Sequence, residues 1–232
     1  MDRNGNVYTI LYASVMVIAV AAILAVTAIG LKPFQKKNIE IEKKQNILAS
    51  VNIAADAATA ESIYAEKIVN SYVVNAKGEV VEGEAFTIDL KKERAKADVN
   101  ARLLPVFECQ IDGTVKYILP MYGAGLWGPI WGYVSVEADM NTIFGATFDH
   151  QGETPGLGAE ISTEAFEKPF KGKKIFDAEG KFVSIVVAKS NETAPVEHKV
   201  DAISGGTITS KGLQKMIFDD LSSYKAFLES KN

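Results

Sequence analysis

Residues 106–122 read VFECQIDGTVKYILPMY, and this stretch decides the fold. Apolar and polar residues alternate on both sides of Asp112-Gly113, a residue pair that two-residue β-turns favour. A strand buries alternate side chains, whereas a helix buries every third or fourth one, so the alternation predicts two antiparallel strands. The pattern therefore predicts a β-hairpin that begins near residue 105.

The same alternation returns further along the chain. Residues 130–150, IWGYVSVEADMNTIFGATFDH, predict a second hairpin with its turn near residues 138–141. Residues 173–190, KKIFDAEGKFVSIVVAKS, predict a third one around Glu179-Gly180. Residues 162–170 suit a short helix, and residues 210–228 suit a closing helix with an apolar stripe of Leu213, Met216, Ile217, Leu221 and Tyr224. Antiparallel hairpins flanked by helices define the α+β class.

The chain before residue 105 is predicted to be mostly helical. From Gln35 to about Asn70 it is charged, Ala-rich and apolar at helical spacing, which indicates a stalk helix and a second helix that starts near Asp56 or Thr59. Residues 86–90 are a short strand candidate, and residues 91–104 suggest a helix ended by Pro105. We therefore predict three segments: a tail and transmembrane helix over residues 1–34, a helical stalk and lead-in over residues 35–104, and an α+β domain over residues 105–232.

An uncharged run near the N-terminus predicts a membrane anchor. Residues 4–31 carry no charge, and the run exceeds the roughly 20 apolar residues that cross a bilayer as a helix. A cleaved signal peptide has only about 7–15 apolar residues, and a buried core helix normally carries charges on one face. Lys32, Lys36 and Lys37 favour a cytoplasmic domain by the positive-inside tendency, but long domains cross membranes largely regardless of charge. Charge alone leaves the orientation open.

Composition narrows the function classes. The 232 residues carry a formal net charge of −4 without a basic cluster, which argues against nucleic-acid binding. Cys109 is the only cysteine, so neither an internal disulfide nor a thiolate metal cluster can form. Two histidines, His150 and His198, disfavour a histidine-built metal site. We expect no metal ligands, and no acid–base pair or nucleophile is evident.

The segment Gly123-Ala-Gly125-Leu-Trp-Gly128 matches the G-x-G-x-x-G pattern of dinucleotide-binding folds. That site needs a helix that begins at the glycines and points its N-terminus at the pyrophosphate. Pro129 and a strand pattern follow here, so we exclude this kind of NADH site. Trp127 and Trp131, among close-approach glycines, could still cover a flat heteroaromatic ring, and core packing explains them equally well.

A second Gly-rich loop, QGETPGLG at residues 151–158, follows a predicted strand. Its glycines let the backbone approach a ligand, and Glu153 and Thr154 offer hydrogen-bonding groups, although a plain surface loop has the same composition. Lys189 ends a predicted strand and could pair with a phosphate or another negative charge on a ligand. A solvated lysine is the plainer interpretation for that residue.

Residues 201–207 read DAISGGT and lead into the closing helix. Free N–H groups and the helix dipole favour a phosphate at such a helix start, although Ser, Thr and Gly are also common in ordinary caps. The stretch resembles the Asp-x-x-Ser/Thr-Gly-Ala-Thr signature, on which a flavin transferase esterifies FMN to the last threonine, Thr207 here. Gly206 replaces the usual alanine, and we expect the missing methyl group to loosen the turn.

The apolar run, GLWG, GETPGLG and SGGTITS follow one another at separations that resemble the C subunits of the Na+-translocating NADH:quinone oxidoreductase family. The resemblance covers nearly the whole chain. The G subunits of the Rnf electron-transport complexes share the anchor, an ETPGLG-type loop and the flavinylation motif. They are the second possibility, because GLWGPIWGY is more similar to the first family.

The resemblance implies a single N-terminal span in the cell inner membrane and a periplasmic FMN-binding domain. FMN would be phosphoester-linked to Thr207, and Asp201 and Ser204 would serve recognition by the flavin transferase. The chain would relay electrons among the membrane subunits of a complex that oxidises NADH, reduces ubiquinone and exports Na+. A non-redox anchored binding or assembly module and a free-standing flavoprotein are the alternatives. The implied FMN contacts are Leu126, Trp127, Glu153, Thr154, Leu157, Gly158, Lys189, Ser204, Gly205 and Gly206.

Overall fold

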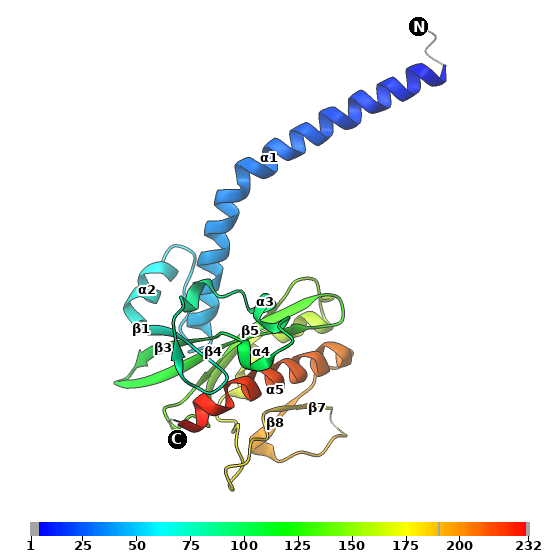
Figure 1. The fold of residues 1–232 in the computed structure, drawn as a ribbon. Helices are drawn as coiled ribbons and strands as arrows, with labels where there is room; N and C mark the ends of the chain where they lie inside the picture. Colours follow the sequence, from blue (N-terminus) through cyan, green and yellow to red (C-terminus); the bar gives the residue numbers. More distant parts are fainter. Residues whose placement is uncertain (1–4, 190, 231–232) are drawn as a thin grey trace. The chain divides into compact units, whose positions relative to one another are not determined.

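A long apolar helix and an α+β domain make up the chain (Figure 1). The computed structural model describes residues 5–189 and 191–230, so the first four residues of the predicted tail lie outside the described residues. The chain divides into two compact units between Lys43 and Lys44. The predicted α+β class is confirmed.

The first unit is an exposed apolar helix. Helix α1 spans Asn6–Ala49, and nearly all its side chains in residues 7–31 are exposed. It is long and apolar enough to cross a membrane, where lipid would cover these side chains. The helix continues without interruption past Pro33 and through the start of the predicted stalk. It thus supplies both the predicted span and the first stalk helix.

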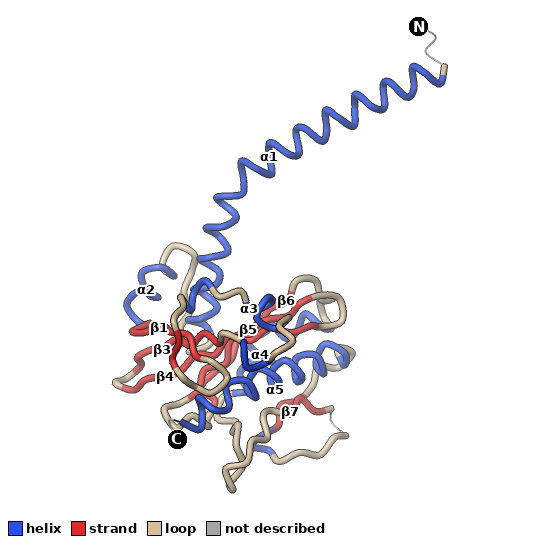
Figure 2. The backbone as a smooth tube through the Cα atoms, viewed as in Figure 1, coloured by secondary structure: helices blue, strands red, loops and turns tan. Residues whose placement is uncertain are grey.

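Six antiparallel strands form the main sheet of the second unit, in the order β2-β1-β3-β4-β5-β6 (Figure 2). Ile111 pairs with Thr114 across the turn, where Asp112 and Gly113 have φ values of 49° and 77°, so the first hairpin is confirmed. The pairing of β5 with β6 confirms the second. The strands are β1 (Ile68–Val74), β2 (Val80–Val81), β3 (Leu104–Ile111), β4 (Thr114–Ala124), β5 (Pro129–Val136) and β6 (Ile143–His150).

Alternate strand residues face two separate cores, as the period of two requires. Val106, Leu119 and Val134 belong to one core. Their sequence neighbours Phe107, Ile118 and Tyr133 belong to the other. Helix α5 (Thr207–Ser230) covers the first face, and all five residues of its predicted apolar stripe are buried there. The last turn of α1 covers the second face through Ile47.

Short helices complete the domain. Helix α2 (Ala60–Lys67) is the predicted second stalk helix. The elements η3 (Gly158–Ser162), α4 (Glu164–Glu167) and η4 (Lys168–Phe170) form the predicted helical segment around residues 162–170. They follow the Gly-rich loop of residues 151–158, and they pack on β6.

The predicted third hairpin is present only in part. An isolated antiparallel bridge joins Phe176 to Phe182 around the turn at Gly180, and the N–H groups of Asp177 and Val183 donate to the carbonyl groups of Lys181 and Ile175. Ser184 then adopts a φ of 62°, which interrupts the extended chain. Strand β7 (Val186–Ala188) instead pairs in parallel with β8 (Lys199–Asp201), and η5 (Val196–His198) precedes β8.

Two predictions for the lead-in are also wrong. The strand candidate at residues 86–90 is occupied by η1 (Ala85–Thr87), and the helix predicted over residues 91–104 is only α3 (Leu90–Arg94) followed by η2 (Val99–Ala101). This stretch has too few apolar residues to bury a helical face, and the Asp89 and Asp98 side chains cap short turns instead. Strands β1 and β2 were not predicted, because β1 follows α2 without a breaker.

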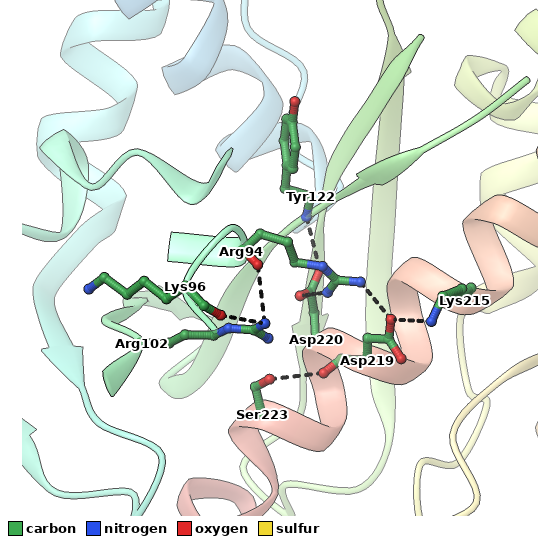
Figure 3. A network of polar contacts seen from close by, with 8 residues as sticks. All are labelled: Arg94, Lys96, Arg102, Tyr122, Lys215, Asp219, Asp220 and Ser223. Atoms are coloured by element: carbon green, nitrogen blue, oxygen red, sulfur yellow. Dashed lines mark hydrogen bonds and ion pairs between the residues drawn. The ribbon is translucent and has the colours of Figure 1, made fainter. Parts of the chain in front are cut away.

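A network of ionic contacts fixes α5 against α3 and β4 (Figure 3). Arg94 contacts Asp220 and lies 2.6 Å from the carboxylate of Asp219. Asp220 also accepts a 2.9 Å hydrogen bond from the Tyr122 N–H. Burial raises the pKa of Asp220 to about 6, although the Arg94 charge opposes this rise. The network fixes the helix whose N-terminus forms the candidate site.

Candidate functional site

Three segments that are distant in the sequence meet in a pocket of about 360 Å³ at the start of α5. They are the GLWG loop between β4 and β5, the GETPGLG loop after β6, and the SGGTIT segment. The structure thereby brings together most of the residues predicted to bind the cofactor. The lining residues are Leu126, Trp127, Glu153, Thr154, Leu157, Gly158, Gly205, Gly206, Thr207, Ile208 and Thr209.

Thr207 is the first residue of α5 and lies on the pocket wall. The first helical hydrogen bond runs from the Ser210 N–H to the Gly206 carbonyl oxygen at 2.9 Å. Within the described chain, the N–H groups of residues 207–209 and the Thr207 hydroxyl donate no hydrogen bond. A helix start with free donors and a positive dipole end suits an anion such as a phosphate.

An apolar surface lies beside these donors. Leu126, Trp127, Leu157 and Ile208 line the pocket and remain exposed, and Trp127 is 69% accessible. Core packing therefore does not account for Trp127. Trp131, by contrast, is half-buried in β5, opposite Tyr122 and Asp149. Exposed aromatic and aliphatic side chains around a pocket suit a flat, apolar ring.

Glu153 lies on the pocket wall, but its carboxylate is engaged by the protein. One oxygen accepts a hydrogen bond from the Trp127 N–H at 2.8 Å, and the other accepts from the Thr209 hydroxyl at 2.5 Å. The residue is only 5% exposed. Burial alone would raise its pKa, but hydrogen bonds from Thr209, Trp127 and Leu126 outweigh burial and hold the pKa below its usual value. Glu153 is therefore charged at neutral pH.

The turn before Thr207 is tight. Gly206 is buried, and a β-carbon there would lie 2.9 Å from Ile203 Cγ2 and 3.2 Å from the Leu157 carbonyl carbon. The Gly206 N–H also donates to the Ile203 carbonyl at 3.1 Å. That glycine loosens this turn stays a prediction, but the space beside Gly206 is crowded. In this chain the bulk of Ile203 takes the space that an alanine methyl group would need.

Three predicted site residues do not line the pocket. Lys189 directly follows β7, and Asp201 ends β8, so the parallel pairing brings them to the same end of the small sheet. Both are exposed, as is Ser204. Asp201 lies 3.4 Å from the Lys199 ammonium group. Asp201 and Ser204 are therefore accessible from solvent on the segment that leads to Thr207.

Two pocket residues, Ile208 and Thr209, were missed by the sequence analysis. A signal was present, since side chains in the first turn of a helix surround any ligand bound at its N-terminus. The strand predicted after the G-x-G-x-x-G match is confirmed, because residues 125–128 form a loop between β4 and β5. No helix begins there in the described structure.

The fold and the pocket define an FMN-binding domain. The family model described as "FMN-binding domain" matches residues 125–222, which contain all three pocket segments. Among curated relatives, the C subunit of the Na+-translocating NADH-quinone reductase from Haemophilus ducreyi is 36% identical over 82% of this chain and 80% of the relative. The corresponding protein from Neisseria meningitidis serogroup A is 35% identical over 92% of this chain and 88% of the relative.

The fold is similar to solved structures of the same kind of subunit. The crystal structure of the C subunit from Parabacteroides distasonis has 50% sequence identity and a TM-score of 0.81, covering 87% of this chain and 98% of that one. The structure of NqrC from Shewanella oneidensis has 27% identity and a TM-score of 0.71, covering 83% and 97%. The chain belongs to the family of C subunits of the Na+-translocating NADH-quinone reductases.

Proposed function

We propose that this chain relays electrons through an FMN esterified to Thr207. As a family member it is a membrane-anchored, FMN-containing electron carrier within a Na+-translocating NADH:quinone reductase. One observation carries the proposed attachment: Thr207 and the rest of the first turn of α5, with its free N–H groups, line the same pocket as the exposed Trp127. Ubiquinone is the proposed final acceptor of the complex.

The residues present fit FMN. Free N–H groups of residues 207–209 would hold the phosphate, and a covalent link would prevent loss of a carrier that faces water. Leu126, Trp127 and Leu157 would cover the ring, and Thr154 would offer a hydroxyl group at its edge. The bound flavin supplies the redox chemistry, and the chain needs only to hold it, orient it and leave one edge accessible to neighbouring cofactors.

Maturation and topology complete the proposal. Asp201 and Ser204 are exposed beside the acceptor, and they would be recognised by a flavin transferase. Lys189, also exposed, would lie near the phosphate or the polar edge of the ring. Helix α1 would cross the inner membrane once and hold the flavin domain on the periplasmic side, in contact with partner subunits. The length of the domain supports this orientation against the lysine count, since long domains translocate largely regardless of charge.

Covalent attachment can be tested by co-expressing the full chain with a flavin transferase and imaging a denaturing gel. The native chain is expected to give a fluorescent band, and Thr207→Ala should give none. Thr154→Val is the matched control, since it removes a pocket hydroxyl that is not the proposed acceptor and should keep the band. A dark native chain, or a fluorescent Thr207→Ala chain, would overturn the proposal.

A further inference from the structure

We propose that Glu153 is a positioning residue for the flavin: its carboxylate fastens the Leu126-Trp127 loop to the first turn of α5. This inference rests on the proposed function. The loop carries the side chains that would cover the ring, and the helix turn carries the hydroxyl that would hold the phosphate. A residue that joins the two would set the distance between the ring-covering surface and the attachment point.

The hydrogen bonds of Glu153 join three elements. Its carboxylate accepts from the Trp127 N–H at 2.8 Å and from the Thr209 hydroxyl at 2.5 Å, across 26 and 56 positions of sequence. The Leu126 backbone also helps to hold the pKa of this carboxyl group below its usual value. The Glu153 N–H donates to His150 Nδ1 at 3.2 Å, which ties the residue to the end of β6.

The space around the carboxylate is closed on two sides by glycines. A β-carbon on Gly125 would lie 2.4 Å from one carboxylate oxygen, and a β-carbon on Gly158 would lie 2.3 Å from the other. The Gly158 position would also meet the Thr209 hydroxyl at 2.5 Å. The backbone at Gly125 and at Gly158 therefore lies directly against the Glu153 carboxylate. This close packing suits a buried side chain that joins parts of the protein more than one that binds a ligand.

The Trp127 loop has few other attachments. The Gly125 N–H donates to the Gly128 carbonyl at 2.8 Å, which closes the loop on itself. The Leu126 and Trp127 side chains are both exposed, so they contribute little burial. Beside the close packing of Gly212 on Ala124 and Gly125, the Glu153 carboxylate links this loop to α5 through charge-assisted hydrogen bonds.

The carboxylate also has an electronic consequence for a bound flavin. A buried negative charge beside the pocket disfavours electrons added to the ring, because Coulomb interactions are weakly screened there. Glu153→Gln keeps the shape and removes the charge: its amide oxygen can still accept from the Trp127 N–H, and its NH2 group can donate to the Thr209 hydroxyl oxygen. This variant should keep the flavin and raise its midpoint potential, which a merely structural residue would not do.

The bracing is tested first without flavin, in the full chain carrying Thr207→Ala. Glu153→Ala should accelerate hydrogen exchange at the Trp127 amide by about tenfold or more, because this donor loses its acceptor. Glu167→Ala is the matched control, since Glu167 also accepts from a backbone N–H and a threonine hydroxyl but lies outside this pocket. Unchanged exchange in Glu153→Ala would overturn the proposal, whether or not the chain is ever flavinylated.

The second arm uses the flavinylated full chain. The midpoint potential of Glu153→Gln should lie above that of the native chain, whereas Glu167→Gln should match the native chain. Equal potentials in the two glutamine variants would overturn the positioning of Glu153 beside the ring. If no chain carries flavin, the proposed function fails while the exchange measurement still decides the bracing.

Discussion

Glu153 and Glu167 are two carboxylates in similar settings with opposite electrostatic behaviour. Each accepts one backbone N–H and one threonine hydroxyl, and each lines a cavity. The donors to Glu153 are divided between its two oxygens, whereas both donors to Glu167 meet the same oxygen. Burial raises the pKa of Glu167 to about 7, while hydrogen bonding holds the pKa of Glu153 low. Burial outweighs the hydrogen bonds at Glu167, where the nearby Asp149 and Glu164 charges add to the rise, whereas the hydrogen bonds outweigh burial at Glu153.

The same comparison separates the two cavities. The one beside Glu167 is larger, at about 550 Å³, and Lys168 and Lys171 also line it. The one beside Glu153 holds about 360 Å³. Size therefore does not identify the functional pocket. Three Gly-rich segments and a helix start with free donors converge only on the smaller of these two cavities.

Removal of the two carboxylates should change the free energy of unfolding by clearly different amounts. Glu153→Ala is expected to lower the free energy of unfolding by about 3 kcal/mol at pH 7, because buried donors lose a charged acceptor. Glu167→Ala should cost about 1 kcal/mol, because its side chain is only half-buried and its charge is disfavoured. Thermal unfolding of the full chain in detergent measures both. Equal losses of unfolding free energy in the two alanine variants would contradict the difference proposed between Glu153 and Glu167.

Asp220 offers a third carboxylate, held by a cation. Arg94→Leu should destabilise the domain by about 2 kcal/mol at pH 8, because it leaves the Asp220 charge buried without its partner. The loss should shrink below pH 6, where protonation removes that charge. Lys215→Met, on an exposed pair with Asp219, should cost less than about 0.5 kcal/mol. The same pH-independent loss in both variants would be inconsistent with the network in Figure 3.

Glu153 and Glu167 should also differ in how their contributions to stability depend on pH. The folded-state pKa of Glu167 is raised, so its stabilising contribution is present at low pH and lost as pH rises toward 7. The folded-state pKa of Glu153 is lowered, so its contribution is present near neutral pH and lost as pH falls through that pKa.

Glutamine variants should therefore move in opposite directions. Glu167→Gln should raise the free energy of unfolding by about 1 kcal/mol at pH 8, and with it the melting temperature. At pH 5 the same substitution should change the melting temperature little. Glu153→Gln should lower it at pH 7, with a deficit that narrows toward pH 4. Melting curves of both variants across this pH range test the prediction. Melting temperatures that shift in the same direction in both variants at pH 8 would contradict it.

Gly206 tests how tightly the turn before Thr207 is packed. Gly206→Ala should cost about 1 kcal/mol, because the new methyl group would press on Ile203 Cγ2. In an Ile203→Ala background the same substitution should cost less, since that methyl partner is absent. A double-mutant cycle of melting temperatures tests this, and an identical cost in both backgrounds would exclude the clash.

Local patterns predicted the parts of the fold that local chemistry determines. The Asp112-Gly113 turn and the strict alternation beside it were sufficient for β3 and β4. The three-residue parallel pair of β7 with β8 was beyond prediction, because pairing across a long connection leaves no periodic signal in either short strand. The positive φ of Ser184, which breaks the expected hairpin, has no signature in residue type.

The sequence predicted most residues of the site, but it did not predict the contacts that they make. The three segments that line the pocket were expected from their glycines and from the resemblance. The sequence could not reveal that Glu153 faces protein donors, because Trp127 and Thr209 are 26 and 56 positions away. It also could not reveal that Ile203 fills the space beside Gly206, since that contact depends on the folded turn.

Peptide mass spectrometry can locate a flavin esterified to Thr207. Trypsin releases residues 200–211, VDAISGGTITSK, from the full chain co-expressed with a flavin transferase. This peptide is expected to be heavier by the mass of FMN less one water, and fragmentation should assign the addition to Thr207. An unmodified peptide, or an addition on Ser204, Thr209 or Ser210, would contradict attachment to Thr207.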